Sequence, residues 1–229
     1  MSSFTLDQVV PWGRSMDEYQ RLFDLSEDDL QRRILDCAGG PASFNSEMTK
    51  LGRDVLSIDP IYTFSSAQIE QRVHETAKEM VVQLEPNLDE YVWDYFGDVH
   101  GLIRHRLAAM QLFLDDLEQG KVEGRYQVCT LPETGLADQS FGIALCSHFL
   151  FLYTEQLSYD FHLAGILELC RVAEEVRIFP LMALDCRRSA YVDPIREALG
   201  VQGLVAEILP VAYEFQRGGS WMMRIKSEQ

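Results

Sequence analysis

Short apolar runs and longer stretches of helical periodicity follow one another along this chain. Five apolar runs predict buried strands, at 33–37, 54–58, 126–130, 142–146 and 176–179. Apolar residues recur every three or four positions in 44–51 and again in 161–167, which predicts helices between strands. The segments 204–213 and 221–225 flank turn residues at 216–219 and predict a hairpin. Strands that alternate with helices and end in a hairpin predict an α/β fold with a mostly parallel sheet and an antiparallel edge.

The first two predicted strands are joined by a glycine-containing turn and a helix. The strand at 33–37 runs into Ala38-Gly39-Gly40-Pro41, the helix at 44–51 ends beside Gly52, and the second strand ends at Asp59-Pro60. This is the order of one βαβ unit, in which the two strands pair in parallel. The carboxyl ends of both strands should therefore lie at the same edge of the sheet.

Helix-start signals, in which a hydroxyl residue is followed three positions later by an acid or an amide, stand at Ser15, Ser26 and Ser65. The first two predict short helices within 1–32, a helical cover that precedes the first strand. The third opens the stretch 65–124, whose pattern is almost entirely helical. This stretch predicts three helices: one from Ser65 to Pro86, one opening at Asn87, and one that carries Ile103 to Leu117 and ends at Gly120.

This insert between the second and third strands is longer than a usual crossover. It carries large apolar residues, among them Trp93, Phe96 and Phe113. We expect it to form a lid over a ligand site, and the alternatives are a structural buttress or a dimer face. No repeat or linker divides the chain, so residues 1–229 are expected to form a single domain.

Charge and composition exclude several classes of partner. The 229 residues include 20 Lys and Arg against 36 Asp and Glu, a formal net charge of −16. Nucleic acids are bound through clustered cations, so we expect no nucleic-acid partner. The longest apolar stretch, 143–153, is too short to cross a bilayer, and residues 1–10 show no secretory pattern, so we expect no membrane partner. The five cysteines form no C-x-x-C pair, which favours a cytoplasmic location.

Three of the cysteines, Cys37, Cys129 and Cys146, stand near the ends of predicted strands. Thiolates that meet in one pocket suit a soft metal. Buried free cysteine is common, however, and these spacings are irregular, so we expect no metal site.

The carboxyl ends of the first two strands carry the candidate ligand site, because ligands of open parallel sheets bind there. Asp36-Cys-Ala-Gly-Gly-Pro41 suits a ligand loop, since glycines let the backbone approach a ligand closely. It lacks the G-x-G-x-x-G fingerprint and the lysine of a P-loop, and a simple tight turn is the alternative. Asp59 lies 23 residues after Asp36, where an acid accepts hydrogen bonds from both hydroxyls of a ribose. The alternative for Asp59 is an N-cap ahead of Pro60.

Three motifs resemble those of class I S-adenosylmethionine-dependent methyltransferases. Ile34-Leu-Asp-Cys-Ala-Gly-Gly40 is similar to their first motif, and Val55-Leu-Ser-Ile-Asp59 is similar to their ribose-binding strand. Leu136-Ala-Asp-Gln-Ser-Phe-Gly-Ile-Ala-Leu-Cys-Ser-His148 is similar to their fourth motif. The resemblance covers 33–60 and 125–180 and is greatest to the small-molecule, methyltransferase type 11-like subgroup, which includes quinone-biosynthesis enzymes. It implies a Rossmann-like fold with a mostly parallel seven-stranded sheet, an antiparallel C-terminal edge strand and, here, a helical insert after the second strand.

The resemblance also implies a site for S-adenosylmethionine, with S-adenosylhomocysteine as product. Carried over by position, the cofactor-binding residues are Arg14, Asp36, Cys37, Ala38, Gly39, Gly40, Asp59, Pro60, Thr130, Leu131 and Ser147. Asp36, Ala38 and Gly40 would contact the methionine moiety and Asp59 the ribose. Thr130 and Leu131 would lie along the adenine. Two positions depart from the family pattern, because Gly142 and Thr130 stand where acids are usual.

Residues at the expected mouth of this site are candidates for catalysis and closure. Ser147 and His148 would lie where the methyl group is presented, and His148 would act as a general base toward a hydroxyl or amine. A structural histidine is the alternative. Trp12 and Tyr19 would close over the cofactor, and Arg14 would meet its carboxylate unless it is an ordinary surface arginine.

We therefore expect a methyltransferase that acts on a small-molecule substrate, with the insert specifying the acceptor. Methyl transfer from a sulfonium is an in-line displacement that needs positioning and water exclusion rather than a protein nucleophile. One alternative is a catalytically silent S-adenosylmethionine-binding protein with a regulatory or structural role. An NAD-dependent enzyme is disfavoured by the incomplete glycine fingerprint. A second copy of this chain is a further candidate partner, in a homodimer.

Overall fold

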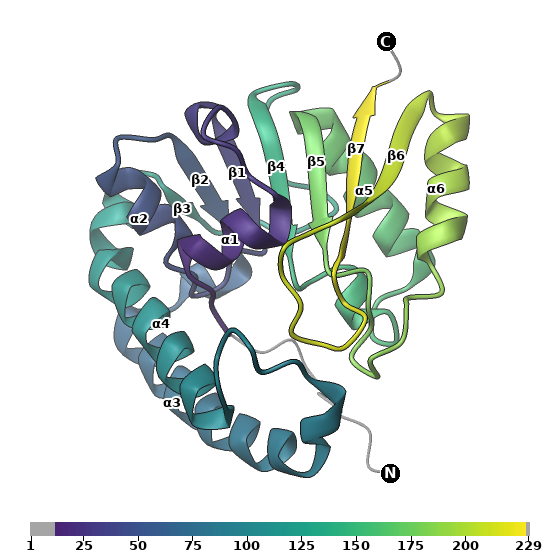
Figure 1. The fold of residues 1–229 in the computed structure, drawn as a ribbon. Coiled ribbons are helices and arrows are strands. Elements are labelled where there is room, and N and C mark those ends of the chain that lie inside the picture. The colour runs from purple at the N-terminus through teal and green to yellow at the C-terminus, as the bar shows by residue number, and fades with distance from the viewer. Residues whose placement is uncertain (1–11, 228–229) are drawn as a thin grey trace.

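The computed structural model describes residues 12–227 of the chain (Figure 1). Its strands are β1 (Ile34–Cys37), β2 (Val55–Ile58), β3 (Tyr126–Gln127), β4 (Phe141–Ser147), β5 (Ala173–Phe179), β6 (Leu204–Pro210) and β7 (Trp221–Ser227). Its α-helices are α1 (Met16–Phe23), α2 (Phe44–Lys50), α3 (Ser66–Leu84), α4 (Val99–Val122), α5 (Tyr159–Val172) and α6 (Val192–Val201). Short 3-10 helices are η1 (Asp29–Gln31), η2 (Pro60–Thr63), η3 (Glu85–Glu90) and η4 (Phe151–Tyr153).

The seven strands form one sheet in the order β3-β2-β1-β4-β5-β7-β6. Strands β1 to β5 pair in parallel, and β7 pairs antiparallel with both β5 and β6. The predicted α/β fold with a mostly parallel seven-stranded sheet is confirmed. The C-terminal strand is the antiparallel one, as expected, but it lies one position inside the edge, which β6 forms. Met222, Met223 and Ile225 are buried in β7, whereas β6 is half-exposed, so the more apolar strand takes the inner position.

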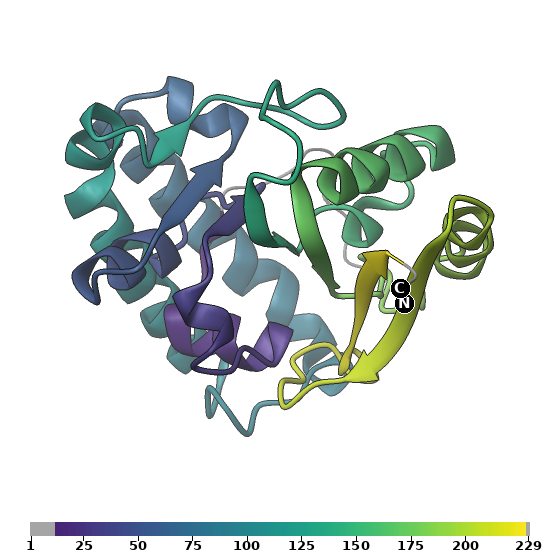
Figure 2. The ribbon, with the colours of Figure 1, turned by 90° about the horizontal axis from the view of Figure 1, so that it is seen from above.

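Helices cover both faces of this sheet (Figures 1 and 2). Along β1, Ile34 belongs to a core that also contains side chains of α1, α2, α3 and α4, and its neighbour Leu35 belongs to a second core with side chains of α5 and α6. Because side chains of a strand alternate between faces, one short apolar strand contributes to two cores. Within residues 12–227 no helix combines the length and the hydropathy that a bilayer crossing requires.

The insert after β2 differs from its prediction in the middle. The capping box at Ser65 and Gln68 is present and opens α3, as expected. The helix predicted to open at Asn87 is wrong: Asn87 has non-helical backbone angles within η3. The chain then runs beside the C-terminal hairpin, where Tyr91 bridges Gln216 and the Val92 N–H donates to Phe215 O over 2.8 Å. The insert is therefore two long helices, α3 and α4, joined by a loop.

Three smaller predictions also differ. The strand predicted over 126–130 ends at Gln127, and the chain turns through a bridge between Thr130 and Glu133. The helix predicted after Ser26 is reduced to the three residues of η1. Helix α6 has no counterpart among the predicted elements. The capping box at Ser15 is present and opens α1, and residues 1–11 of the expected N-terminal cover lie outside the described residues.

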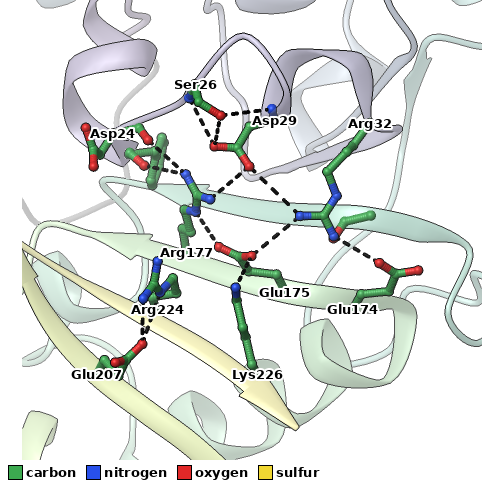
Figure 3. Close-up of polar contacts among 12 residues, drawn as sticks. Asp24, Ser26, Asp29, Arg32, Glu174, Glu175, Arg177, Glu207, Arg224 and Lys226 are labelled. Carbon is green, nitrogen blue, oxygen red and sulfur yellow. Dashed lines mark hydrogen bonds and ion pairs between the residues drawn. The ribbon is translucent and has the colours of Figure 1, made fainter. Parts of the chain in front are cut away.

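A cluster of charged side chains fastens the segment between α1 and β1 to the sheet (Figure 3). Arg177 of β5 donates to the backbone oxygen of Phe23 over 2.8 Å and to Asp29 Oδ1 over 3.1 Å. Its Nε donates to Glu175 Oε1 over 2.6 Å, and Lys226 lies 3.0 Å from the other oxygen of Glu175. Glu175 and Arg177 are both buried, so each charge needs these partners. The cluster holds the end of α1 against the sheet, and α1 carries residues of the site.

Candidate functional site

A cavity of about 440 Å³ opens at the carboxyl ends of β1, β2 and β4. We call it the larger cavity, by comparison with a smaller one that adjoins it. Predicted site residues that line it are Arg14, Cys37, Ala38, Gly39, Gly40, Asp59, Pro60, Thr130, Leu131, Ser147 and His148. Trp12 and Tyr19 also line it. Residues that the sequence did not indicate include Ile61, Phe149 and Phe161. The topology therefore brings together motifs from the N-terminal segment, three strands and the loop after β3.

The loop after β1 lines the larger cavity, and its centre has no room for a side chain on the side that faces Asp36. A Cβ on Gly39 would lie 2.2 Å from Asp36 Oδ2 and 2.9 Å from Tyr62 Oη. Gly40 has φ of +56°, in the left-handed region, and its N–H donates to Asp59 Oδ2 over 3.0 Å. Tyr62 Oη donates to the Gly40 carbonyl over 2.9 Å. The segment is therefore a tight turn that also lines the cavity, so the two interpretations of its sequence do not exclude each other.

Asp59 caps a short helix and faces the cavity at the same time. Its Oδ1 accepts the Ile61 N–H over 2.9 Å, which makes it the N-cap of η2, and its Oδ2 accepts the Gly40 N–H. Burial raises the pKa of Asp59 to about 6, and the two backbone hydrogen bonds oppose that rise. A carboxylate has about four lone-pair sites, so each oxygen keeps acceptor capacity for a ligand.

Asp36 is the one predicted site residue that does not line the larger cavity. It is 1% exposed and lies behind the glycine loop. Tyr19 Oη donates to its Oδ1 over 2.9 Å, and Ser57 Oγ donates to its Oδ2 over 2.8 Å. Burial raises the pKa of Asp36 to about 6. The Asp36 carboxylate lies on the side of the glycine loop that faces away from the cavity. Tyr19 of α1, which donates to this carboxylate, itself lines the cavity.

His148 follows β4 in a strained backbone conformation, with φ of +52°. Ala38, across the same cavity, has φ of +54°. Non-glycine residues in the left-handed region cost free energy and are typical of functional sites. The His148 N–H donates to Phe179 O over 2.6 Å, and Nδ1 lies 2.9 Å from Ser147 Oγ. Burial and the guanidinium groups of Arg14 and Arg106 hold the pKa of His148 well below its usual range, so the imidazole is neutral at pH 7.

A smaller cavity, of about 90 Å³, adjoins the larger one and shares Trp12, Arg14 and His148 with it. Its remaining wall comes from the insert, from η4, from the end of β5 with the loop that follows it, and from the segment between β6 and β7. These residues include Met80, Leu84, Tyr91, Leu102, Arg106, Phe179, Tyr213 and Phe215. Trp93 and Phe96 are not among the lining residues: the ring centroids of both lie 5.5 Å from that of Phe215, behind the wall.

Two arginines stand at this smaller cavity with a single buried carboxylate between them. Arg106 of α4 pairs with Glu18 of α1 and donates to Tyr213 Oη over 3.2 Å. Tyr213 Oη in turn donates to Glu18 Oε1 over 2.9 Å. Arg14 donates to Trp12 O over 2.6 Å and forms no ion pair within residues 12–227. Burial and the charge of Arg106 lower the pKa of Arg14 to about 10, so it stays charged at pH 7.

The cysteines show no arrangement for a metal. Cys37 and Cys146 are buried in register on β1 and β4, and Cys129 is half-buried beside the larger cavity. The hydrogen bond that the Cys37 thiol makes toward Cys146, together with burial, raises the pKa of Cys37, so the thiol stays protonated. Within residues 12–227 no group of three or more His, Cys, Asp or Glu side chains is placed to hold a metal ion.

The strand order with an antiparallel β7 is that of the class I S-adenosylmethionine-dependent methyltransferase fold, as the sequence motifs imply. The chain belongs to the family of the uncharacterized protein MJ0045 from Methanocaldococcus jannaschii: it is 34% identical over 227 residues, which are 99% of this chain and 100% of that protein. No family model matches the chain.

The solved structures to which the chain is similar are distant from it in sequence. One is magnesium protoporphyrin IX methyltransferase from Synechocystis PCC 6803 with bound SAM, at 14% identity over 88% of this chain and 73% of that chain, with a TM-score of 0.45. Another is a SAM dependent methyltransferase from Aquifex aeolicus, at 13% identity over 92% of this chain and 94% of that chain, with a TM-score of 0.41.

Proposed function

We propose that this chain is an S-adenosylmethionine-dependent methyltransferase that transfers a methyl group to a small-molecule acceptor. The observation that carries the proposal is the meeting of two cavities at His148. The larger one carries the glycine loop and Asp59, and the smaller one is mainly apolar. A two-substrate transfer needs two adjoining sites with a shared wall where the reacting atoms meet.

The residues of the larger cavity suit S-adenosylmethionine. Gly39 and Gly40 line this cavity without a side chain, so their backbone can approach the methionine moiety closely. The Asp59 carboxylate suits the two ribose hydroxyls, and Leu131 offers an apolar surface to the adenine. Arg14 is the candidate partner of the donor's carboxylate. When bound, this donor supplies an electrophilic methyl carbon on a sulfonium with a neutral thioether as leaving group.

The chain's own part in the reaction is to position two reactants and to exclude water. Met80, Leu84 and Leu102 of the insert form an apolar wall around the smaller cavity. Such a wall keeps water away from the reacting atoms and accommodates an organic acceptor. His148 is neutral and stands at the junction, so one of its ring nitrogens is available to accept a proton from a hydroxyl or amine.

A methyl-transfer screen tests the proposal. The protein is incubated with S-adenosylmethionine labelled in the methyl group and with fractionated small-molecule extracts. We expect label in at least one small molecule together with stoichiometric S-adenosylhomocysteine. Tight binding of S-adenosylmethionine without transfer to any fraction would favour the catalytically silent binding protein. Binding of NAD in preference to S-adenosylmethionine would contradict the assignment of the larger cavity.

A further inference from the structure

We propose that the smaller cavity takes an acceptor with a carboxylate on an apolar body, and that Arg14 and Arg106 bind this carboxylate. The inference rests on the proposed function, since it names the class of molecule that the same site accepts. It is distinct from the pairing of Arg14 with the donor's carboxylate, because Arg106 lines the smaller cavity and not the larger one.

The charged side chains at the smaller cavity are of one sign. Arg14 and Arg106 line it, and no Asp or Glu is among the lining residues that the structure describes. The larger cavity differs in this respect, since Asp59 is part of its lining. A ligand in the smaller cavity therefore meets two guanidiniums and no carboxylate on the cavity wall.

Glu18, which stands behind this wall, compensates Arg106 but not Arg14. Its Oε2 pairs with Arg106 and lies 3.2 Å from His105 Nε2. Its Oε1 accepts the Tyr213 hydroxyl over 2.9 Å. Arg14 forms no ion pair with Glu18 or with any other acid in the described part of the chain. The cavity is thus left with one positive charge in excess.

Both guanidiniums also keep N–H groups that no residue among 12–227 accepts. An arginine side chain has five N–H donors. Arg14 uses one of them, to Trp12 O over 2.6 Å. Arg106, which is 1% exposed, uses two, to Glu18 and to Tyr213 Oη. The Nε atoms of both arginines are buried without a hydrogen-bond partner. Buried charged donors without acceptors cost free energy, so these groups favour a ligand that supplies acceptor atoms.

A carboxylate matches both the excess charge and the unused donors. As a monoanion it offsets the single positive charge, whereas a neutral ligand leaves that charge uncompensated and a doubly charged phosphate monoester reverses its sign. Its two oxygens suit the planar N–H fork of a guanidinium, and such charge-assisted hydrogen bonds are stronger than those between neutral groups.

The rest of the wall sets the body of the acceptor. Met80, Leu84 and Leu102 of the insert contribute aliphatic side chains, and Phe179 and Phe215 contribute aromatic rings. A mainly apolar wall with a few polar groups that fix orientation is typical of small-molecule sites. The acceptor class is therefore an apolar carboxylic acid.

Two small probes test the charge preference before an acceptor is known. The full chain is saturated with S-adenosylhomocysteine, which fills the donor's site with its own carboxylate. It is then titrated with benzoate and, separately, with benzamide, the neutral analogue of the same shape, and binding is followed by protein NMR. We expect benzoate to bind at least about tenfold more tightly than benzamide. Equal affinities, or no measurable binding of either probe, would overturn the proposal.

Matched arginine variants locate the binding at the smaller cavity. Arg106→Met removes the charge and should reduce the affinity for benzoate to that for benzamide, while the affinity for S-adenosylhomocysteine stays within about twofold. Arg104→Met, at an exposed position of the same helix, should keep the full preference. An undiminished preference in Arg106→Met would contradict the assignment. Arg106→Met leaves Glu18 buried without its cation, so Arg14→Met, which breaks no ion pair within the described residues, replaces it if it does not fold and should lose the preference too.

The methyl-transfer screen gives an independent readout. The small-molecule extract is divided by anion exchange before the reaction, so that acids are retained and neutral or cationic molecules pass through. We expect the methyl-accepting activity in the retained fraction. Activity confined to the fraction that passes through would overturn the inference and leave the proposed function intact. Failure of the wild-type protein to bind S-adenosylhomocysteine would instead overturn the proposed function, and the two failures are therefore distinguishable.

Discussion

Gly39 stands at a point of the loop after β1 where there is no room for a side chain. Its missing side chain makes room for Asp36 Oδ2, which lies 2.2 Å from where a Cβ would be, and Asp36 is itself held by Tyr19 and Ser57. Gly40, its neighbour, has no atom nearer than 4.0 Å to its own Cβ position. The two glycines of the loop are thus required for different reasons, one for space and one for backbone angles.

We predict that Gly39→Ala lowers the affinity for S-adenosylhomocysteine more than Gly40→Ala does. The first must displace the loop or the Asp36 carboxylate, whereas the second adds only the left-handed strain of about 1–2 kcal/mol. Calorimetric titration and melting curves of both variants give binding and stability separately. Wild-type affinity in a folded Gly39→Ala protein would show that the loop does not meet the ligand.

Asp59 should make the protein less stable as pH rises from 4 to 7. Its folded pKa of about 6 lies above its ordinary value of 3.8, so the folded state holds this proton more tightly than the unfolded chain. The resulting stability is complete below pH 4 and is lost as the pH passes through 6, and it amounts to about 3 kcal/mol. Asp59→Asn cannot titrate, so its unfolding free energy in urea should fall less over this range. Identical pH dependence in the two proteins would contradict the placement of this carboxyl.

Most residues that line the larger cavity can be predicted from the sequence, because the carboxyl ends of parallel strands meet at one edge of the sheet. Asp59, Ser147 and His148 lie on the larger cavity for that reason. The side of the loop on which Asp36 lies depends on its contacts with Tyr19, which is 17 residues away, and periodicity carries no such information. Phe161 was missed similarly, since its place at the cavity depends on how α5 docks.

At the scale of elements, the insert is a wall of the smaller cavity rather than a separate cap over the larger one. Helices α3 and α4 supply lining residues to the smaller cavity only. Its helices were predictable from caps and periodicity. Its loop was not, because the segment at Tyr91 and Val92 is held extended by backbone contacts with Phe215 and Gln216, far along the chain.

We predict that Leu102→Ala changes the range of acceptors and leaves the affinity for S-adenosylhomocysteine unchanged. Leu102 is 1% exposed and lines the smaller cavity, so its truncation enlarges that cavity and lowers stability by about 2–5 kcal/mol. Trp93→Ala is the matched control, because Trp93 packs on Phe215 behind the wall and should affect stability alone. Acceptor profiles and melting curves are compared for the two variants. If both variants keep the acceptor profile of the wild-type protein, the insert takes no part in acceptor recognition.

At the scale of the whole molecule, the two cavities differ in how they are built. The larger one belongs mainly to the sheet, whose motifs are local in sequence. The smaller one is closed where Glu18 of α1, Arg106 of α4 and Tyr213, which follows β6, meet in one buried network. These three residues are remote from one another in the chain. Their meeting explains why the lining of the larger cavity could be predicted from the sequence and that of the smaller cavity could not.

The most direct test of this account is the calorimetric titration of S-adenosylhomocysteine into the wild-type protein and Asp59→Ala, with the exposed Asp94→Ala as control. We predict one binding site in the wild-type protein and in the control. Loss of the charge-assisted hydrogen bonds to the ribose should weaken binding to Asp59→Ala by about 1.5–3 kcal/mol, tenfold or more. Absence of binding to the wild-type protein, or equal affinity in Asp59→Ala, would contradict the account.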